Sequence, residues 1–235
     1  MIKKAMILAA GFGKRIHPLT LKLPKPLLKI GNETLLSNAI KFLEQLGLKQ
    51  VVINVHYLSE QISEYISEKK FNLSINIIEE KNKILDTGGG VLNAIQYFDN
   101  QPFLIINPDT IWSSNYFKEV KMMEEKFLQN KKNKCLLLVV NKNKSFDKTF
   151  KGDFDLKKDL LNRNDKKILN YIYTGVQIIT PEVFSDNYNE VFSINEIWDK
   201  LIKKNELYGI ESKINFSHVS TLDIYKKLLE KNFKH

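Results

Sequence analysis

Residues 5–30 read AMILAAGFGKRIHPLTLKLPKPLLKI, and this stretch decides the fold. The apolar run over residues 5–10 predicts a short buried strand. The run stops at Gly11 and Gly13, and glycine permits the backbone angles and close approach that a tight, ligand-facing loop needs. The stretch therefore predicts a strand whose carboxyl end leads directly into a binding loop.

Basic residues follow this loop at once. Consecutive free backbone N–H groups in a loop form a nest for an anion. The guanidinium of Arg15 can donate two parallel hydrogen bonds to phosphate oxygens, whereas Lys25 acts as a mobile point charge. Prolines on both sides of Lys25 remove backbone donors and restrict the local backbone, which holds the direction of that side chain. We interpret the stretch as a cradle for a polyphosphate.

Two better-known phosphate loops are absent from the sequence. The dinucleotide pattern G-x-G-x-x-G fails at Ile16, which leaves a nicotinamide-dependent dehydrogenase as a distant alternative. The pattern G-x-x-x-x-G-K-[ST] is also missing, so the chain is not a P-loop NTPase. The alternative to a phosphate-binding loop is an ordinary β-turn that contains glycine and carries solvated charges.

Length and composition allow one substantial core. The chain has 235 residues, of which 43% are hydrophobic. No run approaches the roughly 18 apolar residues of a membrane span, and the first residues run straight into the first strand, which leaves no room for a signal peptide. The single cysteine, Cys135, excludes an internal disulfide and falls in an apolar run typical of a buried strand. We expect a cytoplasmic protein.

The formal net charge of +9 suits several anionic partners. However, the lysines are spread along the chain and mixed with acidic residues, as in the lysine-rich stretch over residues 131–144. No basic stripe interleaved with aromatic residues and no nucleic-acid motif appears. We expect a solvated basic surface, small phosphorylated ligands, and neither a nucleic acid nor a membrane as partner. The sequence does not indicate an oligomeric state.

The chain alternates between strand and helix patterns. Strands are predicted over residues 5–10, 51–55, 73–78, 103–106 and 136–140, and helices over 34–46, 59–67, 91–98 and 116–128, with Ser59 as a possible N-cap. This alternation predicts an α/β fold of three layers, with a mainly parallel central sheet and helices on both faces. Ligands gather at the carboxyl ends of the strands of such sheets.

The remainder of the chain has a different pattern. It predicts strands over 152–156, 171–180 and 214–219, a helix over 194–204 that begins with the capping box S-x-x-E at Ser193, and a helix over 222–229 capped by Thr221. We expect a single domain over 1–235, with residues 1–140 binding the nucleotide and residues 141–235 closing one wall of the cleft.

Further chemistry-bearing groups follow the strands. A triple glycine, Gly88 to Gly90, follows Asp86 and Thr87 at a predicted helix start, where the backbone can lie against a base or a phosphate; a loose turn is the alternative. Asn107-Pro108-Asp109 places a carboxylate just beyond an apolar strand. Asp109 is either a turn residue or a ligand of Mg²⁺, and the nearby cradle favours the metal.

The second half offers partners for a sugar. Thr174-Gly175-Val176 supplies a hydroxyl and backbone groups, and Glu196 supplies a carboxylate. Glu196 is also the third helical residue of the capping box, so a structural role competes with ligand binding.

The composite L-A-A-G-x-G-x-R-x-x-P-x-T followed by P-K-P-L closely resembles the signature of the sugar-1-phosphate nucleotidyltransferases. The resemblance extends over nearly the whole chain and includes NVHYL at 54–58, LDTGGG at 85–90, NPD at 107–109, GDF at 152–154, TGV at 174–176 and HVST at 218–221. It implies the Rossmann-like fold of the nucleotide-diphospho-sugar transferases.

The resemblance also implies site residues. The nucleotide would be bound by Ala9, Ala10, Gly11, Phe12, Gly13, Lys14, Arg15, Lys25, Asp86, Thr87, Gly88 and Gly89. The sugar phosphate would face Asn107, Asp153, Thr174, Gly175, Val176 and Glu196. Arg15, Lys25 and Asp109 would be catalytic, and Asp109 would hold Mg²⁺, with His218 as a second possible ligand.

The implied reaction joins a nucleoside triphosphate and a sugar 1-phosphate and releases pyrophosphate. Because a phosphate monoester has a second pKa of about 6, the nucleophile is already ionised at neutral pH, and no general base is needed. The closest resemblance is to short bacterial members that use UTP and N-acetylmuramate 1-phosphate in cell-wall recycling. A mannose-1-phosphate guanylyltransferase, and a catalytically weak nucleotide- or sugar-phosphate-binding protein, are the alternatives.

One position departs from the family pattern. Where many relatives place a second metal-binding aspartate, this chain has His218, and Ser220 replaces the usual glycine. Imidazole is a poorer ligand for Mg²⁺ than a carboxylate, because hard cations prefer oxygen. His218 therefore binds a phosphate or packs as a structural residue, or the second acid comes from elsewhere, with Asp223 as a candidate.

Overall fold

The computed structural model describes residues 1–130, 132–163 and 169–231, so Lys131 and the terminal His235 lie outside the described residues. Nine strands of the described chain form one sheet in the order β5-β4-β1-β6-β10-β7-β11-β9-β8. The strands are β1 (Lys4–Leu8), β4 (Gln50–Val55), β5 (Ser74–Glu79), β6 (Phe103–Ile106), β7 (Cys135–Asn141), β8 (Asp155–Lys157), β9 (Leu160–Asn162), β10 (Tyr171–Ile179) and β11 (Leu207–Ser212). The pair β2 (Lys29–Ile30) and β3 (Glu33–Thr34) forms a separate small sheet.

The sheet is mixed, with a parallel half that carries the first strand. β1 pairs in parallel with β4 and β6, and β4 pairs in parallel with β5. β10 runs antiparallel between β6 and β7, and β11 is again parallel to β7. Because β10 comes from the second half of the sequence, both predicted halves share one sheet. The predicted α/β architecture is confirmed, and the division of binding between the halves stays a prediction.

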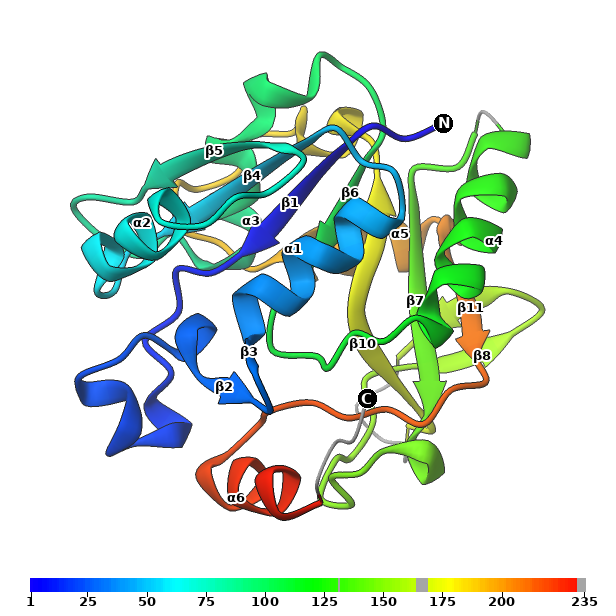
Figure 1. Cartoon of the computed structure of the whole chain (residues 1–235). Coiled ribbons are helices and arrows are strands. Elements are labelled where there is room, and N and C mark those ends of the chain that lie inside the picture. The colour runs from blue at the N-terminus through cyan, green and yellow to red at the C-terminus, as the bar shows by residue number, and fades with distance from the viewer. Residues whose placement is uncertain (131, 164–168, 232–235) are drawn as a thin grey trace.

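Helices cover both faces of the sheet (Figure 1). The helices are α1 (Leu35–Gln45), α2 (Ser59–Ser67), α3 (Asp86–Asn93), α4 (Asn115–Gln129), α5 (Ile194–Lys203) and α6 (Leu222–Glu230). Short 3₁₀ helices span Lys14–Ile16, Leu19–Leu21, Lys25–Leu27, Ile95–Phe98, Lys142–Lys144 and Pro181–Phe184. In the view of Figure 1, α1 and α4 lie in front of the sheet, and α3 and α5 lie behind it.

The strand periodicity divides the core into two layers. Ala5 and Ile7 face the cluster that includes buried residues of α1, α2 and α4, whereas Met6 faces the cluster formed with α3 and α5. Successive side chains of a strand point to opposite faces, so a strand covered on both sides must be apolar throughout. This explains why the sequence of β1 shows no alternation between apolar and polar residues.

The predicted strand over 214–219 is wrong. Residues 216 and 218 form only isolated bridges, from Phe216 to Ser145 and from His218 to Thr110, and the strand of this region is β11, which was not predicted. Gly209 lies inside β11, where a Cβ atom would stand 2.8 Å from the side chain of Leu161. Glycine weakens a strand pattern in a sequence, but here it permits close packing against β9.

Helix caps were predicted with mixed success. The side chain of Ser193 accepts from the backbone N–H of Asn195, and that of Thr221 from the backbone N–H of Ile224, so both residues are N-caps as predicted. The predicted capping box is incomplete, because among the described residues the exposed Glu196 carboxylate accepts no hydrogen bond from the Ser193 N–H. Ser59 is not an N-cap, because it is already the first residue of α2 and the left-handed Leu58 (φ 52°) holds the cap position. The Ser59 hydroxyl donates to Glu79 at 2.6 Å instead.

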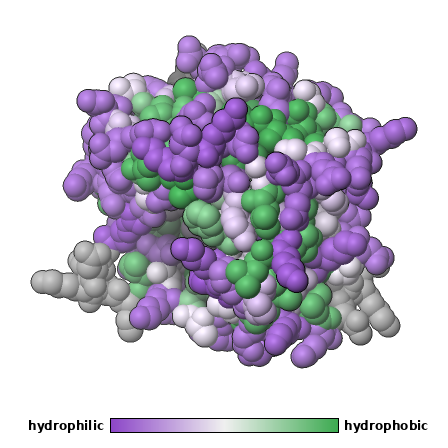
Figure 2. All heavy atoms as spheres, turned by 90° about the vertical axis from the view of Figure 1, so that its left-hand side faces the viewer, coloured by the Kyte–Doolittle hydropathy of each residue, from purple (hydrophilic) through white to green (hydrophobic). Residues whose placement is uncertain are grey.

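The surface agrees with the dispersed charge of the sequence. Hydrophilic residues predominate on the face shown in Figure 2, where apolar residues form separate groups around a hollow. None of the described helices is long and apolar enough to cross a membrane.

The cysteine gives a test of the core. Cys135 is fully buried in β7, its thiol donates to Gln177 Oε1 at 3.4 Å, and burial raises the pKa of this thiol well above its usual range. Since the thiolate is the reactive form, we expect no reaction with a disulfide reagent such as DTNB in the native protein, and reaction of one thiol per chain after unfolding in guanidinium. Full reaction of the native protein would contradict this burial.

Candidate functional site

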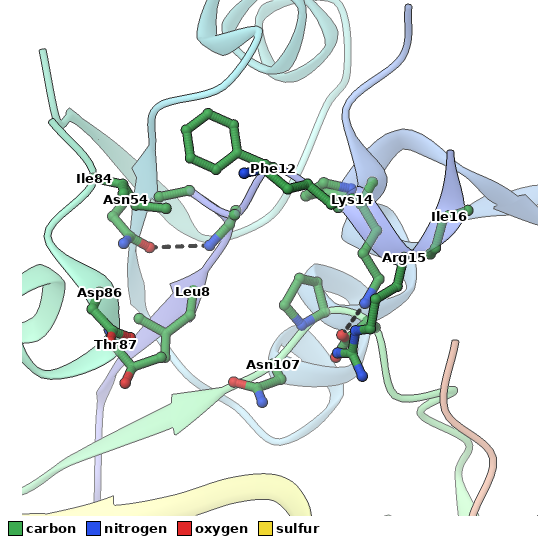
Figure 3. Close-up of a pocket in the computed structure, with 18 of the residues that line it drawn as sticks. Leu8, Phe12, Lys14, Arg15, Ile16, Asn54, Ile84, Asp86, Thr87 and Asn107 are labelled. Carbon is green, nitrogen blue, oxygen red and sulfur yellow. Dashed lines mark hydrogen bonds and ion pairs between the residues drawn. The ribbon is translucent and has the colours of Figure 1, made fainter. Parts of the chain in front are cut away.

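A pocket of about 470 Å³ lies at the carboxyl ends of the parallel strands β1, β4 and β6 (Figure 3). It is lined by Leu8, Ala9, Ala10, Gly11, Phe12, Gly13, Lys14, Arg15, Ile16, Lys25, Pro26, Asn54, Ile84, Asp86, Thr87, Asn107, Pro108, Asp109 and Ser220. Asp86 and Thr87 lie across the pocket from Lys14 and Arg15. The structure thus brings together twelve of the predicted site residues, namely Ala9 to Arg15, Lys25, Asp86, Thr87, Asn107 and Asp109.

The predicted cradle forms one wall of this pocket. Gly13 has a left-handed backbone (φ 65°), and its carbonyl accepts from the Thr20 hydroxyl at 2.9 Å and from the backbone N–H of Ile16 at 2.9 Å. A Cβ atom at Gly13 would stand 3.1 Å from both Thr20 and Lys25. Among the described residues, the backbone N–H groups of Gly11 and Phe12 have no hydrogen-bond partner, so they can donate to an anion.

Opposite charges meet at the edge of the cradle. Lys25 forms an ion pair with Asp109 Oδ2, and His218 Nε2 lies 3.0 Å from the same oxygen. Burial by itself would raise the pKa of the Asp109 carboxyl, but His218 and Lys25 outweigh burial and hold this pKa well below its usual range. Asp109 is therefore ionised at every physiological pH.

The donor set fits a divalent cation that is shared with phosphates. Asp109 Oδ1 is buried and has no hydrogen-bond partner among the described residues. No group of three or more histidine, cysteine and acidic side chains suited to a metal occurs in the part of the chain that the structure describes. Mg²⁺ at phosphate-transfer sites typically needs only one or two protein carboxylates and completes its shell with phosphate oxygens and water. Asp109 meets that requirement.

His218 reaches the site but does not line the pocket. Its ring packs with those of Phe216, at 5.9 Å between centroids, and Phe150, at 5.8 Å, and its Nδ1 has no hydrogen-bond partner among the described residues. Asp223, the other candidate for a second acid, lies on α6 with 71% of its side chain exposed and pairs with Lys227 at 2.7 Å. Asp109 therefore meets an imidazole rather than a second carboxylate.

Aromatic residues stand beside the cradle. The Phe12 ring contacts His56 edge-on and Tyr57 at a tilt, each with 5.5 Å between centroids, and Lys14 Nζ lies 5.2 Å from the centroid of Phe12. His56, whose role the sequence did not indicate, donates through Nδ1 to the backbone carbonyl of Glu80 at 2.5 Å. These contacts hold the tip of the cradle against the end of β4.

The triple glycine lies inside a helix, which corrects the prediction that it precedes one. α3 begins at Asp86 rather than at residue 91, and the N–H groups of Gly88 and Gly89 both donate to the carbonyl of Phe192, at 2.9 and 3.0 Å. A Cβ at Gly88 would overlap the Phe192 ring, and one at Gly89 the carbonyl oxygen of Glu190. Neither residue lines the pocket, so these glycines permit close packing, and their contact with a base stays a prediction.

The TGV segment at residues 174–176 is also buried in the protein. Thr174 is fully buried and its hydroxyl donates to the Leu138 carbonyl at 2.9 Å, and Val176 lies in the core. Gly175 has a positive φ of 95°, and its carbonyl accepts from the backbone N–H of Asn107 at 2.7 Å. The segment positions the β6 terminus, and its contact with a sugar phosphate stays a prediction.

Two more of the predicted sugar residues lie outside the pocket. Asp153 accepts from the backbone N–H of Tyr173 at 2.9 Å, and burial raises the pKa of its carboxyl. Glu196 is exposed in the first turn of α5. Their predicted contact with a sugar phosphate remains untested.

Sequence reasoning missed several lining residues, above all Asn54. A lone amide within the apolar strand VVINV is a signal that could have identified it. Ser220 was noted only as a departure from the family, but it lines the pocket and donates to the buried Asp147 at 2.6 Å. Leu8, Ile16, Pro26, Ile84 and Pro108 contribute apolar surface that no local pattern distinguishes from core.

The chain is an α/β protein with a pocket at the carboxyl edge of its parallel strands, where such folds bind their ligands. Residues 4–149 match the family model described as nucleotidyl transferase, and the chain belongs to that family. The chain is an enzyme of the sugar-1-phosphate nucleotidyltransferase class.

Two curated relatives have the same name, N-acetylmuramate alpha-1-phosphate uridylyltransferase. The protein of Caulobacter vibrioides is 29% identical over 92% of this chain and 91% of its own. That of Neisseria meningitidis serogroup B is 33% identical over 77% of each chain. A solved structure of a putative glucose-1-phosphate thymidylyltransferase from Bacillus anthracis has a TM-score of 0.81 at 19% identity and covers 99% of this chain and 96% of that one, which supports the fold.

The packing role of the α3 glycines can be measured. An alanine inside a helix normally stabilises it relative to glycine by up to about 1 kcal/mol. We expect Gly89→Ala to lower the free energy of unfolding by about 1–3 kcal/mol instead, because its methyl group overlaps the Glu190 carbonyl. Urea unfolding measures the change. Gly11→Ala is the control, since a Cβ there meets nothing within 4 Å; equal stability of the two variants would contradict the packing role.

Proposed function

We propose that this chain joins UTP and N-acetylmuramate 1-phosphate to give UDP-N-acetylmuramate and pyrophosphate. The observation that carries the general reaction is the meeting of Arg15, Lys25 and Asp109 at a glycine cradle on the carboxyl edge of the sheet. The choice of substrates rests on the two relatives of that name, which match this chain over most of its length.

Arg15 and Lys25 are the proposed catalytic cations. The nucleophile is a phosphate monoester oxygen that is already ionised, so the protein has only to align it with the α-phosphorus and to offset the charge that accumulates in the transition state. Arg15 can hold two phosphate oxygens at once, and Lys25 sits where the cradle meets Asp109. The site needs no nucleophilic side chain for this chemistry.

Asp109 is the proposed Mg²⁺ ligand, and His218 is a possible second contact. When bound, Mg²⁺ would supply positive charge that offsets the negative charge of the phosphates. The ionised carboxylate of Asp109 with an unpartnered Oδ1 is the feature of this chain that suits the ion. His218 donates to Asp109 Oδ2 and so holds the orientation of the carboxylate.

The remaining site residues keep their proposed roles. Ala9 to Arg15, Lys25, Asp86 and Thr87, with Gly88 and Gly89 behind them, are assigned to the nucleotide. Asn107 lines the pocket on the side assigned to the sugar phosphate, toward which Asp153, Thr174 to Val176 and Glu196 are proposed to contribute. The proposed product is a cell-wall intermediate, so we place the reaction in cell-wall recycling, in the cytoplasm where UTP is made.

Asp86 favours a second candidate, a mannose-1-phosphate guanylyltransferase. Its carboxylate lines the pocket, and one oxygen accepts from the backbone N–H of Thr87 at 2.6 Å. Guanine presents two adjacent donors, N1–H and N2–H₂, which match the two acceptor oxygens of a carboxylate, whereas uracil presents the single donor N3–H. A third candidate, a protein that binds these ligands with weak catalysis, is motivated by the imidazole in place of a second carboxylate.

Pyrophosphate release with Mg²⁺ tests the three candidates directly. UTP, GTP, CTP and dTTP are crossed against the 1-phosphates of N-acetylmuramate, mannose, glucose and N-acetylglucosamine. We expect the highest kcat/KM for UTP with N-acetylmuramate 1-phosphate. Preference for GTP with mannose 1-phosphate would establish the second candidate, and nucleotide binding without turnover would establish the third.

Removal of the Asp109 charge tests its catalytic role. We expect Asp109→Asn to lower kcat by about 10²–10³-fold, because one preorganised charge at the reacting phosphates is lost. Calorimetry of Mn²⁺ binding should show a matching loss of affinity. Asp223→Asn is the control, since Asp223 is exposed on α6 and should leave both quantities unchanged. If Asp223→Asn loses activity and Asp109→Asn does not, the assignment of the acid is wrong.

A further inference from the structure

Two buried polar side chains meet at one side of the pocket: the one near the end of β4 lines the pocket, and the other lies just beyond β5. Asn54 and Glu80 are each only 3% exposed. No ion pair to Glu80 forms among the described residues, although a buried carboxylate is costly without compensation. Hydrogen bonds must therefore account for its presence in the core.

These hydrogen bonds form a continuous chain. The backbone N–H of Ala9 donates to Asn54 Oδ1 at 3.0 Å, and Asn54 Nδ2 donates to Glu80 Oε1 at 2.7 Å. The backbone N–H of Leu85 donates to Glu80 Oε2 at 2.8 Å. Figure 3 shows the first of these bonds, between the side-chain oxygen of Asn54 and a backbone nitrogen of the neighbouring segment. The two ends of this series of hydrogen bonds, at Ala9 and Leu85, belong to different walls of the pocket.

The order of donors and acceptors is unique. Both backbone groups at the ends are donors, so the oxygen of the Asn54 amide must face Ala9 and its nitrogen must face Glu80. Glu80 then accepts on both of its oxygens, which suits a carboxylate and no neutral amide. Gly90 of α3 closes over the pair, because a Cβ there would stand 2.7 Å from Asn54 Nδ2 and 2.9 Å from Glu80 Oε1.

We propose that Asn54 and Glu80 are positioning residues for the nucleoside triphosphate, which tie the phosphate cradle to the wall that carries Asp86 and Thr87. Ala9 is the residue from which the cradle starts, and Leu85 is the residue before α3. The pair therefore sets the distance between the two walls. This inference rests on nucleotide binding at this pocket and not on the identity of the base or the sugar.

A merely structural role explains the arrangement less well. An apolar pair of similar volume would fill the same space without the cost of burying a carboxylate. The two outer bonds do not join sheet to sheet, but end on the first residue of the cradle and on the last residue before α3. A chain of hydrogen bonds with a single allowed polarity fixes the positions of the groups at its ends.

The polarity of the chain defines a set of isosteric variants. Glu80→Gln places an N–H₂ group against either Asn54 Nδ2 or the N–H of Leu85, so one bond is replaced by two facing donors. Asn54→Asp places two carboxylate oxygens against each other. In the double variant Asn54→Asp/Glu80→Gln, the new carboxylate at position 54 accepts from Ala9 and from the new amide at position 80. The oxygen of that amide accepts from Leu85, so every bond is restored with the charge moved from one residue to the other.

The experiment compares Kd for the nucleotide, KM for the sugar 1-phosphate, and Tm for the four proteins. UTP and GTP are titrated with Mg²⁺ by calorimetry, and the one that the wild type binds more tightly is used. We expect each single variant to raise Kd about tenfold, because a buried hydrogen bond is lost and a polar group is left unpaired. The double variant should return to within about threefold of the wild type. KM for the sugar 1-phosphate should change less than about twofold in all of them.

Gln177→Leu is the matched control for lost stability. It removes the buried acceptor of the Trp198 indole N–H, at 3.0 Å, outside the pocket. We expect it to lower Tm without changing the nucleotide Kd. The inference is overturned if the single variants resemble this control, or if the double variant binds no better than the singles. If a single variant does not fold, the double variant decides: wild-type-like affinity supports the inference, and weak binding by a folded double variant overturns it.

The outcome is separable from that of the proposed function. Failure of the wild type to use UTP with N-acetylmuramate 1-phosphate changes the substrates but leaves the comparison of variants intact, because it uses whichever nucleotide the wild type binds. Absence of any nucleotide binding by the wild type would overturn the proposed function and this inference together. If the wild type binds a nucleotide tightly and the single variants bind it with the same Kd, this inference alone is overturned.

Discussion

The parallel pairing of β1 with β4 on one side and with β6 on the other is the constraint on which the pocket depends. Leu8 pairs with Asn54, and Ile7 with Ile106, so the three strands end at the same edge of the sheet. A slip of one residue would turn every side chain of a strand to the other face, and strands that are covered by helices on both faces resist such a slip. The core therefore brings the cradle, Asn54 and the carboxylate of Asp109 to the same edge of the sheet, where hydrogen bonds and ion pairs between neighbouring groups set the finer positions.

Charge then organises what the sheet has brought together. Asp109 lies just beyond the end of β6, Lys25 begins the short 3₁₀ helix Lys25–Leu27, and His218 comes from a segment near the carboxyl terminus. Burial would make a lone carboxylate at this point unfavourable, and the two neighbouring groups keep it ionised. The same two groups limit how much free negative charge Asp109 presents to the pocket. The buried carboxylate of Glu80 has no such cation beside it among the described residues, and hydrogen bonds from Asn54 and Leu85 compensate for its burial instead.

Failures of the sequence analysis share one physical origin. The triple glycine was predicted at the start of a helix and β11 was not predicted, but Gly88 to Gly90 lie within α3 and Gly209 within β11, and in both places another segment approaches too closely for a Cβ atom. Residues 214–219 have a strand-like composition, but among the described residues they pair with no strand and form only isolated bridges. In each case the neighbour that decides the outcome is distant in sequence. Local patterns carry no information about it.

The sequence by itself determined the alternation of strands and helices, the helix caps at Ser193 and Thr221, the burial of Cys135, and a cradle that continues from the first strand into Arg15 and Lys25. These features depend on residues within a few positions of one another, so periodicity, capping chemistry and glycine content suffice. Only the tertiary structure decided that β10 runs antiparallel between β6 and β7, that His218 meets Asp109, and that Glu80 is a buried partner of Asn54 rather than part of a solvated loop. Each of these contacts joins groups separated by 26 to more than 100 residues, and such contacts form only when the packing of the sheet and its helices has selected which surfaces meet.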